Sequence, residues 1–339
     1  MKKQLLTAIT LASMACLAQA QSSVTLTGTM DAGIGSIRMS GDSASTSSVV
    51  SGGMTTPWFG VAGKEDLGGG LKASFALDGF FNNGNGTSGR FPGDTLFSRD
   101  ANVSLSGGFG TVTLGRGLAP NFLPTVIFNP FGDSFTYSPL VLHANVPLFN
   151  SSNWAATTPS DTGWNNEVIY STPNFGGLSG NLHYQLGGIS GQSSKSNIGG
   201  NFLYFAGPLA LTGFFEQDQL TNPGTSTLIG TTKTDWMVGG SYDLKTVKLY
   251  ATTGSAKANN SSITTKTSSV GASIPAGGGS FLADYANTKV DAGKTRQTAT
   301  VGYDYNLSSR TDIYANYMND KITTYTAGNS YGIGIRHKF

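Results

Sequence analysis

Apolar and polar residues alternate in this chain, and the alternation recurs from one end to the other. It is clear in the segments 24–34, 178–186, 298–307 and 331–339. In a β-strand, successive side chains point to opposite faces, so each segment would have one apolar and one polar face. The pattern predicts an all-β protein, and it fits a soluble sandwich as well as a membrane barrel.

The number and spacing of these segments favour the barrel. The sixteen candidate strands start near Val24, Trp58, Leu71, Leu96, Thr111, Asn166, Leu178, Asn197, Leu209, Thr232, Val247, Lys266, Ser280, Arg296, Thr311 and Asn329. Their connections alternate between short and long, which is typical of an outer-membrane barrel. We therefore expect one domain, residues 21–339, that folds as a sixteen-stranded antiparallel transmembrane β-barrel.

The composition agrees with a barrel in lipid. Charged residues make up only 12% of the chain, whereas about 25% is usual for globular domains. Outward positions must be apolar or aromatic, because a lysine or arginine at the bilayer midplane costs about 2–4 kcal/mol. After residue 20 the sequence has no run of 18 apolar residues, so we expect no transmembrane helix.

Residues 1–20 have the features of a secretory signal peptide. Lys2 and Lys3 precede a mostly apolar run over residues 5–17, and a small-x-small cleavage site follows at residues 18–20. Cleavage there would leave a mature chain that begins at Gln21. The alternative is an ordinary hydrophobic N-terminal helix.

Cleavage after residue 20 decides whether the mature chain keeps its single cysteine and what net charge it has. Cys16 lies inside the signal segment, so the mature chain would have no disulfide; a lipoprotein acceptor is the alternative, although Ser13 stands where leucine is expected. Of 21 lysines and arginines, removal of the first two leaves 19, which matches the 19 acidic residues. A neutral mature chain gives no electrostatic reason to expect nucleic-acid binding.

Five segments carry a resemblance to a known family. They are 23–33, 63–73, 108–116, 166–180 and 331–339. Together these segments resemble the general porins of Gram-negative outer membranes, the trimeric sixteen-stranded type. The resemblance implies a homotrimer in outer-membrane lipid, with a water-filled pore for passive diffusion of small hydrophilic solutes and ions. It implies no cofactor and a third loop that folds inward to narrow the pore.

The longest connection, residues 117–165, is expected to be that third loop. Its segment 129–133 is similar to the constriction-loop turn of the family. The aromatic residues expected to narrow the pore and to anchor the loop are Phe128, Phe131, Phe135 and Tyr137.

In the family, an acidic cluster on the third loop faces arginines on the wall. In this chain Asp133 is the only charged residue from 117 to 160, and the candidate wall arginines are Arg38, Arg99 and Arg116. Three arginines opposite one aspartate predict a mild preference for anions.

Two observations complicate this assignment. Trp58 and Ala62 stand where relatives often place arginines, which predicts a less charged constriction. In addition, strict alternation would point Arg99 and Arg116 outward. A bulge at Gly115 would turn the second arginine inward; otherwise both arginines could form salt bridges at the trimer interface.

Further charged residues fall on the polar side of the alternation and are expected to face the lumen. They are Lys72, Asp78, Asp304, Arg336 and Lys338.

The C-terminal segment has a separate predicted role in assembly. Tyr331, Ile333 and Ile335 alternate with polar residues or glycine, and Phe339 ends the chain. An aromatic residue at this place resembles the signal read by the outer-membrane insertion machinery. We also expect the last strand to pair with the first, near residues 24–34, to close the barrel.

Catalysis and metal binding have little support in the sequence. His143, His183 and His337 have no partners at metal-ligand spacing, so we expect neither an enzyme nor a metal site. Two other classes stay open: an outer-membrane adhesin or structural barrel without an open pore, which conductance would distinguish, and a soluble secreted β protein, which cell fractionation would distinguish.

Overall fold

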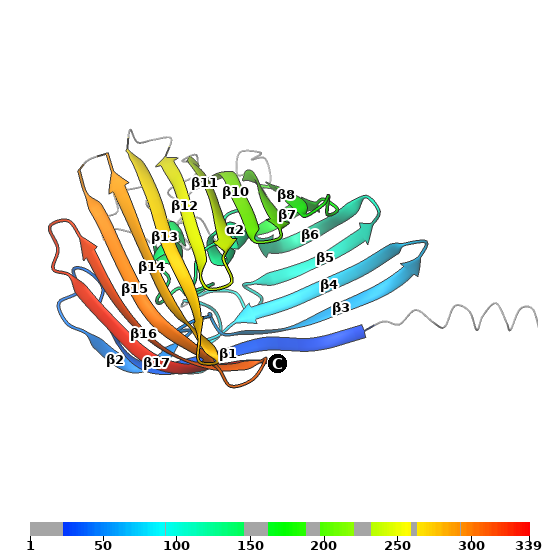
Figure 1. Ribbon diagram of the computed structural model, residues 1–339. Coiled ribbons are helices and arrows are strands. Elements are labelled where there is room, and N and C mark those ends of the chain that lie inside the picture. Colours follow the sequence, from blue (N-terminus) through cyan, green and yellow to red (C-terminus); the bar gives the residue numbers. More distant parts are fainter. Residues whose placement is uncertain are drawn as a thin grey trace, which may run out of the picture.

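The computed structural model describes residues 23–91, 93–145, 162–187, 197–219, 232–258, 263–291 and 293–339. These residues form one closed antiparallel sheet (Figure 1). The strands are β1 (Ser23–Ile37), β2 (Thr46–Ser51), β3 (Trp58–Gly68), β4 (Leu71–Phe80), β5 (Asp100–Gly107), β6 (Gly110–Leu118), β7 (Gly163–Ser171), β8 (Leu178–Gln185), β9 (Ile198–Ala206), β10 (Leu209–Gln219), β11 (Thr232–Asp243), β12 (Lys248–Ala258), β13 (Thr264–Ala276), β14 (Gly279–Val290), β15 (Thr295–Asn306), β16 (Thr311–Ile322) and β17 (Gly328–Lys338).

The barrel wall has sixteen strand positions although seventeen strands are present, because β2 and β3 together fill one position beside β1. Both strands pair antiparallel with the same edge of β1: β2 with its second half and β3 with its first half. Between them, the short segment 52–57 leaves the wall. The predicted sixteen-stranded barrel is confirmed.

The barrel closes where the two ends of the chain meet. Residues 29–36 of β1 pair with residues 331–338 of β17. Beyond the strand, the Phe339 N–H donates to the Gly28 carbonyl at 3.0 Å, and the Gly28 N–H donates to the Phe339 carbonyl at 3.1 Å. The predicted pairing of last and first strands is thus confirmed, and neither strand is left with an open edge.

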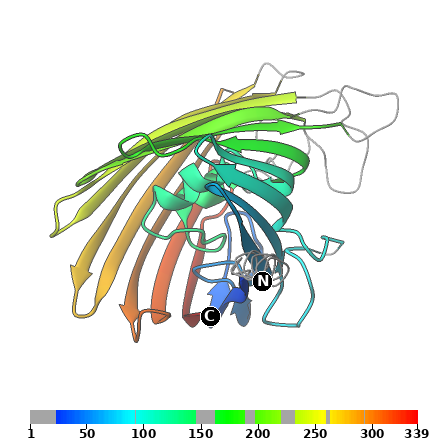
Figure 2. The ribbon, with the colours of Figure 1, turned by 90° about the vertical axis from the view of Figure 1, so that its right-hand side faces the viewer.

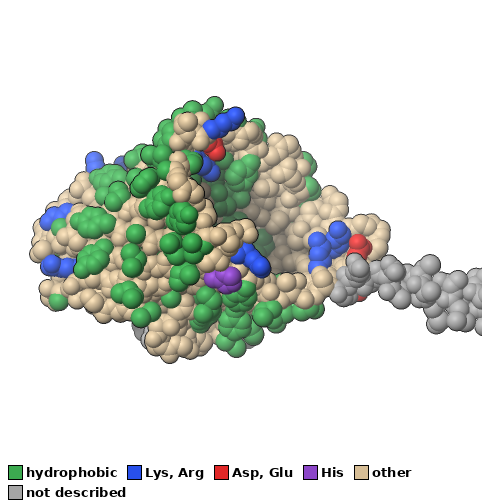
Figure 3. Space-filling model, turned by 60° about the horizontal axis from the view of Figure 1, so that its bottom comes forward, with side chains coloured by type: hydrophobic (Ala, Val, Ile, Leu, Met, Phe, Trp, Pro, Cys, Tyr) green, Lys and Arg blue, Asp and Glu red, His purple; other side chains and the backbone are tan. Residues whose placement is uncertain are grey.

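The alternation of the sequence separates the two faces of the wall. In β16, Ile313 and Tyr317 are exposed on the outer face, whereas Asp312 and Asp320 are buried on the inner face. The outer surface is accordingly rich in hydrophobic side chains (Figure 3). Among the described residues, no helix is both long and apolar enough to span a bilayer.

Predicted and observed strands differ at three places. Most starts agree within two residues, but β5 begins at Asp100 rather than Leu96, and β7 begins at Gly163 rather than Asn166. β2 was expected to be part of a long loop. Its sequence, TSSVVS, has no alternation, and it is a strand because it adds to the free edge of β1.

The long connection after β6 contains two short helices, α2 (Phe122–Ile127) and α3 (Pro139–Asn145). The helix α2 contacts β9 and β10, and α3 contacts β13, β14 and β15. Figure 2 shows both helices within the curve of the wall. Since β13–β15 are far from β6 and β7 around the barrel, the connection crosses its interior.

Candidate functional site: the narrowed lumen

The tip of the long connection is held by an apolar cluster. Phe131 and Tyr137 are almost completely buried. They belong to a cluster whose other members are Met54, Leu142, Leu282, Tyr314 and Met318. Burial of one such side chain stabilises by about 1.5–3 kcal/mol, so these two aromatic residues anchor the connection against the wall.

The remaining predicted aromatic residues behave differently from each other. Phe128 is 1% exposed and stacks on Phe205 of β9, with the ring centroids 6.4 Å apart. Phe135 is half-buried. Of the two, Phe128 therefore anchors the connection, while Phe135 keeps part of its surface free.

Polar contacts fix the same connection at both of its helices. The imidazole of His143 lies 2.8 Å from the hydroxyls of Thr288 and Thr298 through its two ring nitrogens. Near α2, the Asn121 amide donates to the Glu216 carboxylate at 3.1 Å. Burial, followed by the nearby charge of Arg296, lowers the pKa of His143 well below its ordinary value. A neutral imidazole, with one donor and one acceptor, fits two hydroxyl partners.

The segment 52–57 folds into the interior and is organised by Asp31 of β1. This carboxylate is 0% exposed. It accepts the N–H groups of Met54 and Thr55 at 2.7 Å each and that of Gly53 at 3.2 Å. The hydroxyl of Tyr314 donates to it at 2.5 Å. The carboxylate thus replaces the backbone partners that the segment loses when it leaves the wall.

This segment in turn holds the tip of the long connection. Ser134 donates to the Gly53 carbonyl at 2.6 Å, and Thr136 donates to the Gly52 carbonyl at 2.9 Å. The hydroxyl of Thr55 donates to Asp133 at 2.8 Å. Sequence reasoning missed this support, because its contacts join residues about eighty positions apart in a stretch read as a loop.

Arg336 links three strands to this segment. Its guanidinium lies 3.3 Å from Asp304 and 3.1 Å from Asp312, and it donates to the Thr55 hydroxyl at 3.0 Å. The structure therefore brings together two residues expected to face the lumen, Asp304 and Arg336, and connects them through Thr55 to Asp133.

Arg99 lies beside the tryptophan that stands at an expected arginine position. Its guanidinium carbon is 4.0 Å from the centre of the Trp58 ring. The same group lies 3.3 Å from Asp78 and 3.8 Å from Asp100. Arg99 precedes β5, so the alternation of that strand does not set its direction.

Arg116 is turned by a bulge. The register of β6 against β7 shifts between Gly115 and Gly117, and Gly115 has a φ of 135°, which favours glycine. The Arg116 side chain donates to the carbonyls of Ser98 and Gly163 at 2.7 and 3.1 Å. It is 8% exposed, so its hydrogen-bonding capacity is used within the chain rather than at an outer interface.

Arg38, Lys72 and Lys338 take no part in the contacts of Arg99, Arg116 and Arg336 described above. Arg38 follows β1 and donates to the Asp42 carbonyl of its own turn at 3.2 Å. Lys72 lies at the start of β4, and Lys338 ends β17; both positions are at the short-turn end of the barrel.

The charge balance near the network differs from the expected one. Arg99, Arg116 and Arg336 contribute the positive charges. The carboxyl groups that accompany them are Asp31, Asp78, Asp100, Asp133, Asp304, Asp312 and Glu167. The premise that Asp133 alone opposes the arginines is therefore wrong, because the wall supplies further acids from inward positions.

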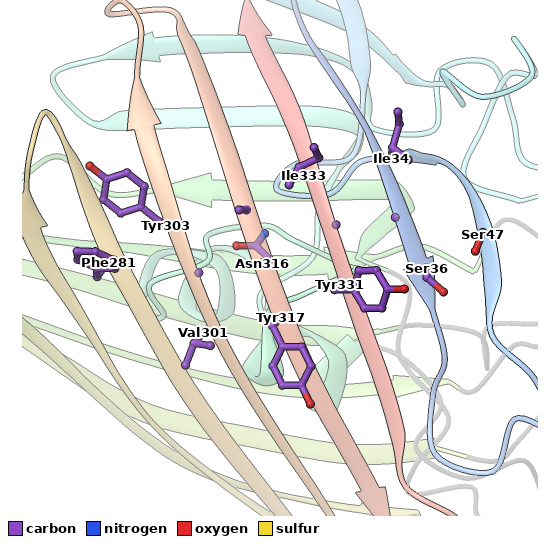
Figure 4. Close-up of a pocket in the computed structure, with 14 residues that line it drawn as sticks. Ile34, Ser36, Ser47, Phe281, Val301, Tyr303, Asn316, Tyr317, Tyr331 and Ile333 are labelled. Carbon is purple, nitrogen blue, oxygen red and sulfur yellow. The ribbon is translucent and has the colours of Figure 1, made fainter.

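The outside of the barrel carries a separate hollow (Figure 4). Its volume is about 720 Å³, and it lies over β14–β17, β1 and β2. Its lining includes the small residues Gly302, Ala315 and Gly332 and the aromatic residues Tyr317 and Tyr331. The lining is mainly apolar and lies on the outer side of the wall, so this hollow is not a solute site of the lumen.

The closed wall and the connection that crosses its interior define a β-barrel channel of the outer-membrane type. The chain matches the family model for Gram-negative porins over residues 6–325 and belongs to that family.

Individual relatives agree over the whole chain. It is 32% identical to outer membrane porin protein 32 of Delftia acidovorans, with all of both chains covered. An outer membrane porin protein of Bordetella pertussis is 29% identical, also over all of both chains. Among solved structures, the anion-selective porin from Comamonas acidovorans is similar with a TM-score of 0.76 and 28% identity, over 94% of this chain and 100% of that one. The protein is thus a multi-pass β-barrel of the Gram-negative outer membrane that serves as a passive diffusion channel.

Proposed function

We propose that the connection between β6 and β7 sets the width of the channel and so limits which hydrophilic solutes pass. The observation that carries this proposal is the attachment of the connection at two separate parts of the wall. Its tip, with Phe131 and Tyr137, packs on Met54 and on residues of β14 and β16, while α2 contacts β9 and β10, where Asn121 donates to Glu216. A connection fixed at both sides keeps a constant cross-section.

Deletion of residues 126–141 tests the proposal. Removal of the tip should raise single-channel conductance in planar bilayers, since the crossing segment no longer occupies the lumen. Deletion of the exposed residues 84–87 serves as the control and should leave conductance near the native value. Native conductance in a correctly folded 126–141 deletion would refute the proposal.

We infer that ion selectivity is weak. Each arginine of the network already interacts with carboxylates or carbonyls of the chain, as the Arg99–Asp78 and Arg336–Asp312 pairs illustrate. A passing anion then meets arginine charges that already have partners within the chain, so none of them attracts it strongly. The mild anion preference expected from the arginines stays a prediction, which a reversal-potential measurement under a salt gradient would test.

We further propose a homotrimer, as the family resemblance implies, and removal of residues 1–20 on export. Those twenty residues lie outside the described part of the chain. Light scattering of the folded protein in detergent would measure the subunit number. N-terminal sequencing of the exported chain should read Gln21 first.

A further inference from the structure

The outer face of β12–β16 carries charged side chains of one sign only. Its exposed charged residues are Lys257, Lys266, Lys289 and Lys321. The acidic residues of the same strands occupy inward positions; they are Asp284, Asp304, Asp312 and Asp320. The four lysines are called the lysine row below.

Two members of the row face each other directly. Lys266 of β13 pairs in register with Lys289 of β14. Like charges directly opposite on a sheet are destabilising. On the flanking strands, Lys266 pairs with Ser255 of β12 and Lys289 pairs with Thr295 of β15, and both of these partners are uncharged.

Nothing in the described chain neutralises this pair. Within the described ranges, no carboxylate lies within 4.0 Å of either ammonium group. The neighbouring residues 259–262 and 292, which lie outside those ranges, are uncharged in the sequence. The nearest acid along the chain is Asp291, just past the end of β14. The pair therefore has no salt bridge among the described residues, and its exposed ammonium groups are accessible to an anion from outside the chain.

The row lies at one level of the barrel, beside the long loops. Lys257, Lys289 and Lys321 each stand one residue before the end of their strand, and Lys266 stands two residues after the start of β13. In Figure 3, some of the Lys and Arg side chains lie along one edge of the hydrophobic outer face, and others lie elsewhere on the visible surface.

The lysine row lies at a membrane boundary, because the apolar part of the strands between the row and the short turns has the height of a bilayer core. Phe281, on the same face of β14 as Lys289, is 55% exposed near the short-turn end. Eight residues separate them, or about 26 Å along the strand and roughly 20 Å in height, because barrel strands are tilted by about 35–45°. The apolar band of an outer-membrane barrel is about 25 Å tall, and a lysine side chain carries its charge further toward water. The ammonium groups therefore lie at the headgroups of the leaflet on the long-loop side.

We propose that the lysine row binds phosphate groups of lipid headgroups in that leaflet. A phosphate between Lys266 and Lys289 would replace a repulsion with two charge-assisted contacts. Lysine is depleted at protein–protein contacts, and the residues below the row face lipid, so a lipid fits this surface better than a second copy of the chain. Lys321 already donates to the Tyr325 carbonyl at 2.6 Å, which makes it an outlying member of the row.

The test is lipid binding by the full folded protein in detergent, followed by native mass spectrometry. The probe is bisphosphorylated lipid A, compared with the dephosphorylated molecule with the same acyl chains. The variant Lys266→Gln/Lys289→Gln removes the central pair, and Lys266→Arg/Lys289→Arg keeps its charge. Lys64→Gln/Lys245→Gln removes two exposed lysines at the short-turn end and is the matched control.

We expect affinity for the phosphorylated probe to fall roughly 25-fold in the glutamine variant, about fivefold per lysine. The arginine variant and the control should bind like the native chain. The dephosphorylated probe should bind weakly to all of them. Either single glutamine variant removes the like-charge contact, so it should fold at least as stably as the native chain in lipid-free detergent.

Two results would overturn the proposal. One is equal binding of the phosphorylated probe by native chain and glutamine variant. The other is dissociation of the oligomer in the glutamine variant with unchanged lipid binding, which would assign the row to a contact between copies. Conductance should be native in every lysine variant, because the row lies outside the lumen; this keeps the test separate from the proposed role of the long connection.

Discussion

Arg99 shows how the wall controls the local field of the channel. Its guanidinium lies over Trp58 and beside Asp78, so its charge is compensated from the inner face of β4. The sequence predicted both Arg99 and Asp78 as pore residues. It could not predict that they form a pair, because the pairing depends on where the chain turns before β5.

The variant Asp78→Asn should expose the charge of Arg99. An uncompensated unit charge about 4 Å from a passing ion is worth about 1 kcal/mol in bulk water, so the anion-to-cation permeability ratio should rise by up to about fivefold. The measurement is the reversal potential under a salt gradient, with the exposed Asp291→Asn as control. A shift toward cations would contradict the proposed role of Asp78.

His143 makes the docking of the long connection depend on pH. Its pKa is lowered by burial in the folded state, whereas in the unfolded chain it is about 6.5. The unfolded state therefore binds more protons below that value. The docking contribution is complete above about pH 6.5 and falls by up to about 1.4 kcal/mol per pH unit as the pH drops toward the folded-state pKa.

The melting temperature in detergent, measured from pH 7.5 to pH 5, checks this dependence. His143→Gln should flatten the fall of the melting temperature below about pH 6.5. His337→Gln, at an exposed position of β17, should leave it as in the native chain. An unchanged pH dependence in His143→Gln would show that other groups cause it.

At the scale of elements, the sequence predicted what depends on alternation and missed what depends on distant partners. The start of β3 at Trp58 and that of β10 at Leu209 follow from local pattern. The segment 52–57 does not, because its support comes from Asp31 and Tyr314, which are 283 positions apart. The inward turn of Arg116 was predicted as one of two alternatives, through a bulge at Gly115, and the register shifts there.

Removal of Phe339 tests the closing element. Its backbone exchanges two hydrogen bonds with Gly28, and its ring lies directly over that glycine. If Phe339 is also the assembly signal, the truncated chain should accumulate in the periplasm and be degraded, yet refold in detergent. Phe339→Tyr, which keeps an aromatic ring, should insert normally. Normal outer-membrane levels of the truncated chain would show that Phe339 is not the assembly signal.

At the scale of the whole molecule, one closed wall serves two environments. The outer face presents apolar side chains to lipid and positive charges at one boundary. The inner face buries carboxylates and threonines that hold the crossing connection. Alternation with a period of two makes both faces from the same strands, which explains why a chain with few charges can surround a polar interior.

Single-channel recording of the native chain in a planar bilayer tests whether the barrel is an open channel of fixed width. A channel narrowed by a fixed connection in each of three subunits should open in three equal, ohmic steps per insertion. The steps should stay open at moderate voltage, because the connection is anchored at both sides. A folded, membrane-inserted protein that gives no conductance steps would contradict an open channel and indicate a barrel without a pore.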